Sequence, residues 1–246
     1  MQSPKKTQAT KSPHYSVIIP AYNEEKCLPQ TLQSLKDVMD TINFPGEIIV
    51  VDNNSSDHTA EIAKIHGARL TFEAINQISR ARNAGARIAL SEYLIFLDAD
   101  TRISEALLRT ALKNLEQGHC GGGTTITFDR PTGPYARLVL GAWTAISVYF
   151  KLAAGSFIYC RRDAFEQIGG FSEKLYAAEE IRLSSDLKKW GKIHKQSFKM
   201  ITDAPVITSA RKLDKPFRTF LATLTCLFFP FLVYSKTLCW YWYKRD

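Results

Sequence analysis

Two alternating patterns of apolar residues fill the first half of the chain. Short apolar runs of the kind found in buried strands lie at 15–20, 47–52, 68–73 and 93–98. Between these runs apolar residues recur every three or four positions, most clearly over 28–42, which predicts amphipathic helices packed on a core. The resulting βαβαβαβ order predicts an α/β fold whose central sheet is mostly parallel and is flanked by helices on both faces.

The pattern changes beyond Gly118. A helix is predicted to begin at Ser104, a good N-cap residue, and to end near this glycine. After it come a threonine-rich strand (TTITF), a long helical stretch over roughly 134–153, a strand-like segment at 155–161 and a polar helix at about 177–190. These elements predict a second lobe built on the same sheet.

Composition divides the chain into three parts. Residues 1–14, rich in Lys, Thr, Gln, Ser and Pro, are predicted to be a disordered basic tail. Residues 15–212 are predicted to form one domain with halves 15–118 and 119–212, since 246 residues that are 45% hydrophobic can bury a full core. Residues 213–246 form a hydrophobic segment for which we expect association with a membrane.

The net charge of +8 is concentrated at the two ends of the chain. Residues 1–14 carry three lysines and no acid, and residues 199–246 carry eight Lys or Arg against three Asp. Residues 15–198 are therefore charge-balanced, which argues against a basic groove for nucleic acid and for attraction of the ends to an anionic surface such as a membrane. Basic ends that only aid solubility are the alternative.

The C-terminal segment has the composition of a membrane-associating element. Residues 219–235 carry no charge, and aromatic residues at 240–243 follow Lys236. A membrane-spanning helix needs about 20 apolar residues, and Pro230 interrupts this run, so interfacial anchoring fits better than spanning. A helical hairpin packed on the globular domain is the alternative.

The cysteines give no sign of disulfides or of a zinc site. Their number is odd, no CxxC pair occurs, and no apolar leader precedes them. We therefore expect reduced thiols in a cytosolic protein. The five cysteines are Cys27, Cys120, Cys160, Cys226 and Cys239.

The apolar run at 93–98 ends in two carboxylates. Its residues lead directly into Asp98 and Asp100, which are spaced one residue apart. In α/β proteins ligands bind at the carboxyl ends of the strands, so we expect both side chains at the edge of the sheet. Carboxylate oxygens are ligands for hard cations, and the pair is a candidate site for a divalent cation and a phosphate-bearing substrate.

Three further polar clusters are predicted to reach the same edge. Tyr22 and Glu24 leave the first strand together, and the run 52–57 after the second strand offers side chains that can bond a base or a ribose. The run 79–85 (SRARNAG) places cations at a helix start, which suits phosphate. Each cluster taken alone is weak evidence for a binding site, because clusters of Asp, Asn and Ser are usually turn and cap chemistry.

Five motifs together carry a resemblance to a known family. They are, in order, IIPAYNEE, VVDNNSSD, SRARNAG, FLDAD and GGFSEKLYAAEEIRLSSDLKKWG. In order and spacing they resemble the family 2 glycosyltransferases of GT-A fold, across roughly residues 15–200. The resemblance implies a Rossmann-like half at 15–118 that binds a nucleotide sugar and a half at 119–212 that binds the acceptor. It also implies an enzyme that moves a sugar from a nucleotide-diphosphate donor to a hydroxyl with inversion.

The resemblance also implies roles for individual positions. Those implied to contact the nucleoside, the phosphates or the sugar are Ala21, Tyr22, Glu24, Asp52, Arg80, Asn83 and Asp98. Asp100 is implied to ligate Mg²⁺ or Mn²⁺ that bridges the diphosphate. Glu180 lies where the family most often has Asp and is implied to be the general base.

The chemistry of such a transfer requires these groups independently of any family. Departure of a diphosphate builds negative charge on the leaving oxygens, which a cation on Asp100 and the nearby Arg80 can neutralise. An acceptor hydroxyl is a poor nucleophile near neutral pH, so a carboxylate must take its proton, a contribution of about 10²- to 10⁴-fold. Glu180 would supply that carboxylate.

We therefore expect an inverting, metal-dependent glycosyltransferase that uses a UDP- or GDP-linked sugar and an acceptor alcohol. The acceptor is expected to be lipid-linked or membrane-borne, with the enzyme on the cytoplasmic face of a membrane. Two alternatives stay open. A sugar nucleotidyltransferase would also use paired acids and a metal, although it usually has a glycine-rich loop where this chain has Ala-Tyr-Asn-Glu-Glu. A non-catalytic membrane scaffold that binds nucleotide sugars is the other.

Overall fold

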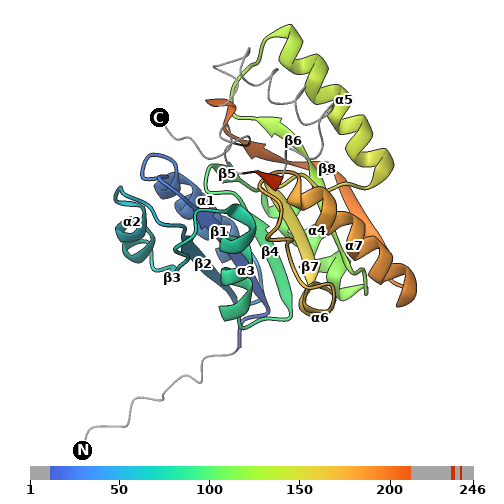
Figure 1. The fold of residues 1–246 in the computed structure, drawn as a ribbon, viewed down its shortest axis with the longest axis horizontal. Coiled ribbons are helices and arrows are strands. Elements are labelled where there is room, and N and C mark those ends of the chain that lie inside the picture. The colour runs from blue at the N-terminus through green and yellow to red at the C-terminus, as the bar shows by residue number, and fades with distance from the viewer. Residues whose placement is uncertain (1–11, 212–233, 236–238, 240–246) are drawn as a thin grey trace, which may run out of the picture.

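A single eight-stranded sheet forms the centre of the molecule (Figure 1). The computed structural model describes residues 12–211, 234, 235 and 239. The strands lie in the order β3-β2-β1-β4-β7-β6-β8-β5. They are β1 Tyr15–Ala21, β2 Gly46–Asp52, β3 Arg69–Phe72, β4 Tyr93–Leu97, β5 Thr101–Arg102, β6 Gly121–Phe128, β7 Phe157–Arg161 and β8 Phe198–Thr208.

Most of the sheet is parallel, as the sequence predicts. Strands β3, β2, β1 and β4 pair in parallel, and β6 and β8 pair in parallel with each other. Strand β7 lies between the two groups and is antiparallel to both β4 and β6, and β5 is antiparallel to β8. The two predicted halves of the domain therefore share one sheet, joined where β4 pairs with β7.

Helices cover both faces of this sheet (Figure 1). Buried residues of α1, α2 and α4 belong to one hydrophobic core, and those of α3, α6 and α7 belong to the core on the other face. The helices are α1 Leu28–Asp40, α2 Thr59–Ile65, α3 Ile78–Ile88, α4 Glu105–Glu116, α5 Pro134–Phe150, α6 Arg162–Gln167 and α7 Glu179–Ile193.

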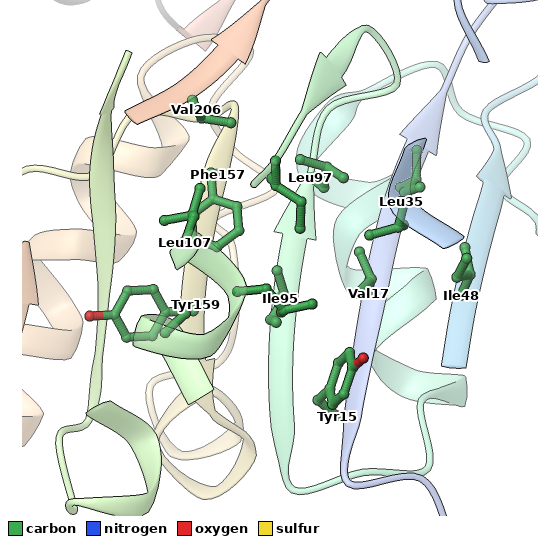
Figure 2. Close-up of a cluster of buried hydrophobic side chains, with 14 of the residues drawn as sticks. Tyr15, Val17, Leu35, Ile48, Ile95, Leu97, Leu107, Phe157, Tyr159 and Val206 are labelled. Atoms are coloured by element: carbon green, nitrogen blue, oxygen red, sulfur yellow. The ribbon is translucent and has the colours of Figure 1, made fainter. Parts of the chain in front are cut away.

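Alternation along the strands builds these two cores. Val17 and Ile95 point to the core that Figure 2 shows, whereas Ile18 and Leu94 point to the opposite core. The side chains of Leu107 from α4 and Phe157 from β7 complete the first core beside the strands (Figure 2). A strand buried on both faces has to be apolar at nearly every position, which explains why the apolar runs predicted these strands.

The predicted helix ends differ from the observed ones by a few residues. Helix α4 begins after Ser104, whose Oγ accepts a hydrogen bond from the Leu107 N–H at 3.2 Å, as an N-cap does. Helix α5 ends at Phe150 rather than near residue 153, because Lys151 adopts a left-handed conformation that stops it. Helix α7 begins at Glu179 rather than at about 177.

The folded part begins before Tyr15. The His14 N–H donates to the Pro45 carbonyl at 2.7 Å, and the His14 ring stacks on Phe44. Residue 14 therefore does not belong to the predicted disordered tail, whose residues 1–11 lie outside the described residues.

Little of the predicted membrane segment 213–246 is described. One of its residues, Cys239, is buried in a small cluster with Leu175 and Ala177. The rest of the segment, apart from residues 234 and 235, lies outside the described residues. Among the helices that are described, none combines the length and the apolar character needed to cross a membrane.

Candidate active site

Loops that follow β1 and β2 meet at one edge of the sheet. The parallel register places Ala21 beside Asp52, so both strands end at the same level. The two loops are then joined by hydrogen bonds from the Asn23 N–H to Ser55 Oγ at 3.1 Å and from the Glu24 N–H to Thr59 Oγ1 at 2.8 Å. This edge is where the sequence predicts a nucleotide site.

Some side chains of the predicted nucleoside pocket also hold the loops in shape. Asp52 is buried, and its Oδ1 accepts from the Ser55 N–H at 3.0 Å. Asn53 donates to the Glu73 and Ile75 carbonyls, which fixes the loop after β3. Tyr22, which follows β1, is partly exposed at this edge of the sheet. The hydrogen bonds of Asp52 and Asn53 are thus those of turn chemistry, and binding of a nucleoside by this run stays a prediction.

Two predicted phosphate contacts hold other partners. Arg80 forms ion pairs with Glu73 at 3.2 Å and Glu173 at 2.6 Å. The Asn83 amide donates to the Phe171 carbonyl at 2.9 Å and accepts from the Phe171 N–H at 2.9 Å. Both side chains therefore contact the loop at 171–175, Arg80 also pairs with Glu73, and neither has Asp98 among these partners.

Arg82, which sequence reasoning missed, is the residue that contacts Asp98. Its Nη2 lies 2.9 Å from Asp98 Oδ1, and its Nη1 lies 2.7 Å from Glu179 Oε1. Nη2 also donates to the Gly155 carbonyl at 2.8 Å, and the guanidinium lies 5.0 Å from the centre of the Phe171 ring. With only 1% of its side chain exposed, Arg82 ties β4, α3 and α7 together in the interior.

Glu180 lies beside this ion-pair cluster. The start of α7 is set by Ala178, whose left-handed conformation is uncommon for a residue with a side chain and is often found at functional sites. A methyl group placed on Gly155 would lie 3.7 Å from the Glu180 carboxyl carbon and 3.1 Å from Arg82 Nη2, so the three residues are neighbours. Burial of the carboxyl group, together with the nearby charge of Glu179, raises the pKa of Glu180 to about 8.

Arg211 is a second residue that the sequence did not indicate. It follows β8, and its Nη2 lies 2.5 Å from Glu24 Oε1 and 2.9 Å from Asp100 Oδ2. Glu24 is buried and Asp100 nearly so. The hydrogen bond to Glu24 and the charge of Asp100 outweigh burial and raise the pKa of Arg211 above its usual range. Glu24 therefore faces an arginine at this edge.

The carboxylates suit a divalent cation that is shared with a substrate. No group of three or more His, Cys, Asp or Glu side chains that could hold a metal occurs among the described residues. Mg²⁺ in phosphate-transfer sites is commonly held by one or two carboxylates together with substrate phosphates and water. Asp100, next to Asp98 at the edge of the sheet, offers this kind of partial site.

The sequence of this chain matches a known family. Residues 16–169 match the model of "Glycosyl transferase family 2". A curated relative, the 4,4'-diaponeurosporenoate glycosyltransferase of Staphylococcus haemolyticus, is 36% identical over 126 residues, which are 46% of this chain and 32% of that protein. The chain thus spans about a third of that relative's length.

Solved structures show the same fold. A mannosyltransferase of Pyrobaculum calidifontis, solved with GDP-Man and Mn²⁺, has a TM-score of 0.64 at 20% identity, covering 82% of this chain and 58% of that one. A fragment of Staphylococcus aureus TarS has a TM-score of 0.61 at 20% identity, covering 85% and 64%. These are GT-A structures, and the predicted GT-A fold is confirmed.

Proposed function

This chain belongs to glycosyl transferase family 2, and we propose that it moves a sugar from a UDP- or GDP-linked donor to an acceptor hydroxyl with inversion. The observation that carries this proposal is the position of Arg82. One guanidinium bonds Asp98 of the Asp-Ala-Asp motif and also Glu179, the neighbour of Glu180. Asp98, proposed to hold the donor, and Glu180, proposed to take the acceptor's proton, thus both lie beside one buried positive charge.

The donor is proposed to lie along the edge formed by the loops after β1, β2 and β4. Tyr22 and Asp52 would contact the nucleoside, and Asp98 and Asp100 would lie at the diphosphate and the sugar. A Mg²⁺ or Mn²⁺ ion bound there would neutralise charge on the leaving diphosphate. The mannosyltransferase that shares this fold was solved with a nucleotide sugar and Mn²⁺, which supports this choice of donor and metal.

Glu180 is proposed as the general base. A carboxylate with a raised pKa is a stronger base than an ordinary glutamate, and it can take a proton from the acceptor hydroxyl as the new bond forms. The proton acceptor must be ionised, so the free enzyme gains activity as the pH rises toward the pKa of about 8.

A test of the reaction separates the proposal from its alternatives. The chain is incubated with single nucleotide sugars and Mn²⁺, and thermal stabilisation identifies the donor. Release of the nucleoside diphosphate that depends on an added acceptor supports a glycosyltransferase. Release of pyrophosphate from a nucleoside triphosphate and a sugar 1-phosphate would instead indicate a nucleotidyltransferase. Binding without any turnover would indicate the scaffold.

We also propose that the acceptor is membrane-borne and that the enzyme works on the cytoplasmic face of a membrane. Helix α5 lies at the far end of the sheet from α2 (Figure 1) and exposes large apolar side chains, with Leu138 72% and Tyr149 81% exposed. No acidic residue occurs between Arg130 and Arg162. An apolar helix with basic neighbours favours an anionic lipid surface.

Vesicle flotation with the full chain tests this contact. Replacement of Leu138 and Ile146 by Glu is expected to lower binding to vesicles that contain anionic lipid. Ile65→Glu is the matched control, because this residue of α2 is 81% exposed but lies away from α5. Equal binding of all variants would contradict a role for α5, and loss of self-association without loss of vesicle binding would assign α5 to a dimer.

A further inference from the structure

We infer that Arg211 acts as the counter-ion of Asp100 while no metal is bound. When a divalent metal binds Asp100, Arg211 leaves this carboxylate and contacts the diphosphate of the donor. This inference rests on the proposed function, since it assumes that Asp100 takes part in metal binding. It concerns a residue outside the five motifs of the family resemblance, on the turn that follows β8.

The contacts place Arg211 between two carboxylates. Its Nη2 is shared by Glu24 Oε1 at 2.5 Å and Asp100 Oδ2 at 2.9 Å. The turn that carries it is held at this edge, because the Ser209 N–H donates to the Asp100 carbonyl at 3.2 Å and β5 pairs with β8 through Thr101 and Thr208. The guanidinium is therefore brought to Asp100 by the backbone and not by a chance rotamer.

Burial makes a resident cation necessary at this point. The Glu24 side chain is only 2% exposed, and an ionised carboxylate taken out of water has to be paired. Asp100 lies beside the same guanidinium, so one positive charge faces two carboxylates and a net negative charge remains to attract a metal ion. A divalent ion on Asp100 and a guanidinium on the same oxygen would repel each other, so the two cations compete there.

Exposure allows this arginine to change partners. Arg211 keeps 31% of its side chain exposed, and its second terminal nitrogen, Nη1, lies 3.3 Å from the Cys27 sulfur, a weak acceptor. An arginine can bind phosphate with two parallel N–H groups, which suits a diphosphate. With Glu24 holding one nitrogen, Arg211 can remain at the edge of the sheet after it has left Asp100.

Two binding constants of Arg211→Gln test the inference. Calorimetry with Mn²⁺ alone should show binding that is roughly five- to tenfold tighter than in the wild type, because a competing positive charge is removed. Calorimetry with UDP and GDP in EDTA should show metal-free binding that is about tenfold weaker, because a phosphate contact is lost. A residue that only supports the fold would lower both affinities together or change neither.

Two further variants complete the test. Arg109→Gln is the control, because Arg109 pairs with Glu105 in an exposed contact on α4, and it should change neither constant. Arg211→Lys keeps the charge and loses the two-armed geometry, so Mn²⁺ affinity should stay near the wild-type value while metal-free nucleotide binding weakens. This variant also decides the case if Arg211→Gln does not fold.

The outcomes separate this inference from the proposed function. If Arg211→Gln leaves Mn²⁺ binding unchanged or weaker, the counter-ion role is wrong even when the enzyme transfers sugar. If the wild-type chain binds no nucleotide with or without Mn²⁺, the proposed function fails, and the measurement with Mn²⁺ alone still decides whether Arg211 competes at Asp100.

Discussion

Two arginine–carboxylate clusters lie at the active edge, and they differ in burial and in charge. The base-side cluster consists of Arg82 with Asp98, Glu179 and Glu180, and only 1% of the Arg82 side chain is exposed. The cation-side cluster consists of Arg211 with Glu24 and Asp100, and 31% of the Arg211 side chain is exposed. The two arginines therefore differ in their access to water, although Glu24 and Asp100, at 2% and 10% exposed, are more buried than Asp98 at 27%.

The exposure of the arginine and the number of carboxylates around it suggest a different role for each cluster. On the base side three carboxylates surround one arginine that is almost fully buried, and burial together with the charge of Glu179 raises the pKa of Glu180. On the cation side two carboxylates share one arginine that water can reach. We therefore propose that the first cluster holds a proton and stabilises the fold, and that the second exchanges one cation for another.

Glu180→Gln removes the proposed general base from the base-side cluster and has the largest expected effect. The amide cannot accept the acceptor's proton, so kcat should fall by about 10²- to 10⁴-fold. Donor affinity should stay near the wild-type value, since the cation-side cluster is intact. The measurements are turnover and donor calorimetry, and Glu166→Gln on the surface of α6 is the control. Near-normal turnover would remove Glu180 from the mechanism.

Replacing Arg82 by Met tests whether the base-side cluster also braces the fold. The change leaves the buried Glu179 and the partly buried Asp98 without their counter-ion, and the free energy of unfolding should fall by about 3–5 kcal/mol. Arg109→Met, which breaks an exposed pair on α4, should cost less than about 1 kcal/mol. Urea denaturation of both variants decides the matter. Equal losses would show that burial does not distinguish the two kinds of ion pair.

The pH dependence sharpens the comparison without any mutation. Because Glu180 must lose its proton, kcat/KM should rise about tenfold per pH unit below its pKa of about 8 and level off above it. Stability should move in the opposite direction. Between pH 4.5, the ordinary pKa of a glutamate, and about pH 8 the folded chain holds a proton that the unfolded chain has lost, so this group lowers stability as the pH rises.

Glu180→Gln provides the check on both pH profiles. The variant should lose the titration step from the rate profile, and its free energy of unfolding should fall less between about pH 5 and pH 8 than that of the wild type. A kcat/KM profile with no step near pH 8 in the wild-type enzyme would mean that another group is the base, because kcat/KM reports groups in the free enzyme. Repeating the profile for kcat shows whether the donor complex lowers the pKa of Glu180, because kcat reports groups in the enzyme–substrate complex.

The sequence predicted the elements and the acidic pair well, because both depend on local patterns. Apolar runs predicted strands that are buried on two faces. In a parallel sheet the carboxyl ends of such strands lie at the same edge. Asp98 and Asp100 could be placed at the edge of the sheet for the same reason. The order β7-β6-β8-β5 was not predicted, since it depends on pairings between segments that carry no periodic signal.

The two arginines show where sequence reasoning stops. Arg82 and Glu179 are 97 residues apart, and Arg211 and Glu24 are 187 apart, so no local pattern reports these pairs. A weak signal did exist for Arg82. Helical spacing from Ser79 places Arg82 and Ala86 on one face, and all three are buried, whereas Arg80 lies off this face. Whether Arg80 or Arg82 contacts Asp98 could be decided only once the position of α3 on the sheet was known.

Gly155→Ala perturbs the base-side cluster alone and has the smallest expected effect. A methyl group there would meet Arg82 Nη2 at 3.1 Å, which is tight, and the Glu180 carboxyl carbon at 3.7 Å. Gly155→Ala should therefore displace the guanidinium slightly, weaken its hold on the ionised Glu180 and shift the rate profile to higher pH. At neutral pH we expect a loss of about two- to fivefold in kcat/KM, with Mn²⁺ binding unchanged because Arg211 and Asp100 are untouched.

Gly141→Ala in α5, where a methyl group would meet nothing within 4 Å, is the control. A change in Mn²⁺ binding without a change in the rate profile would mean that the two clusters are coupled and that the separation drawn between them is wrong.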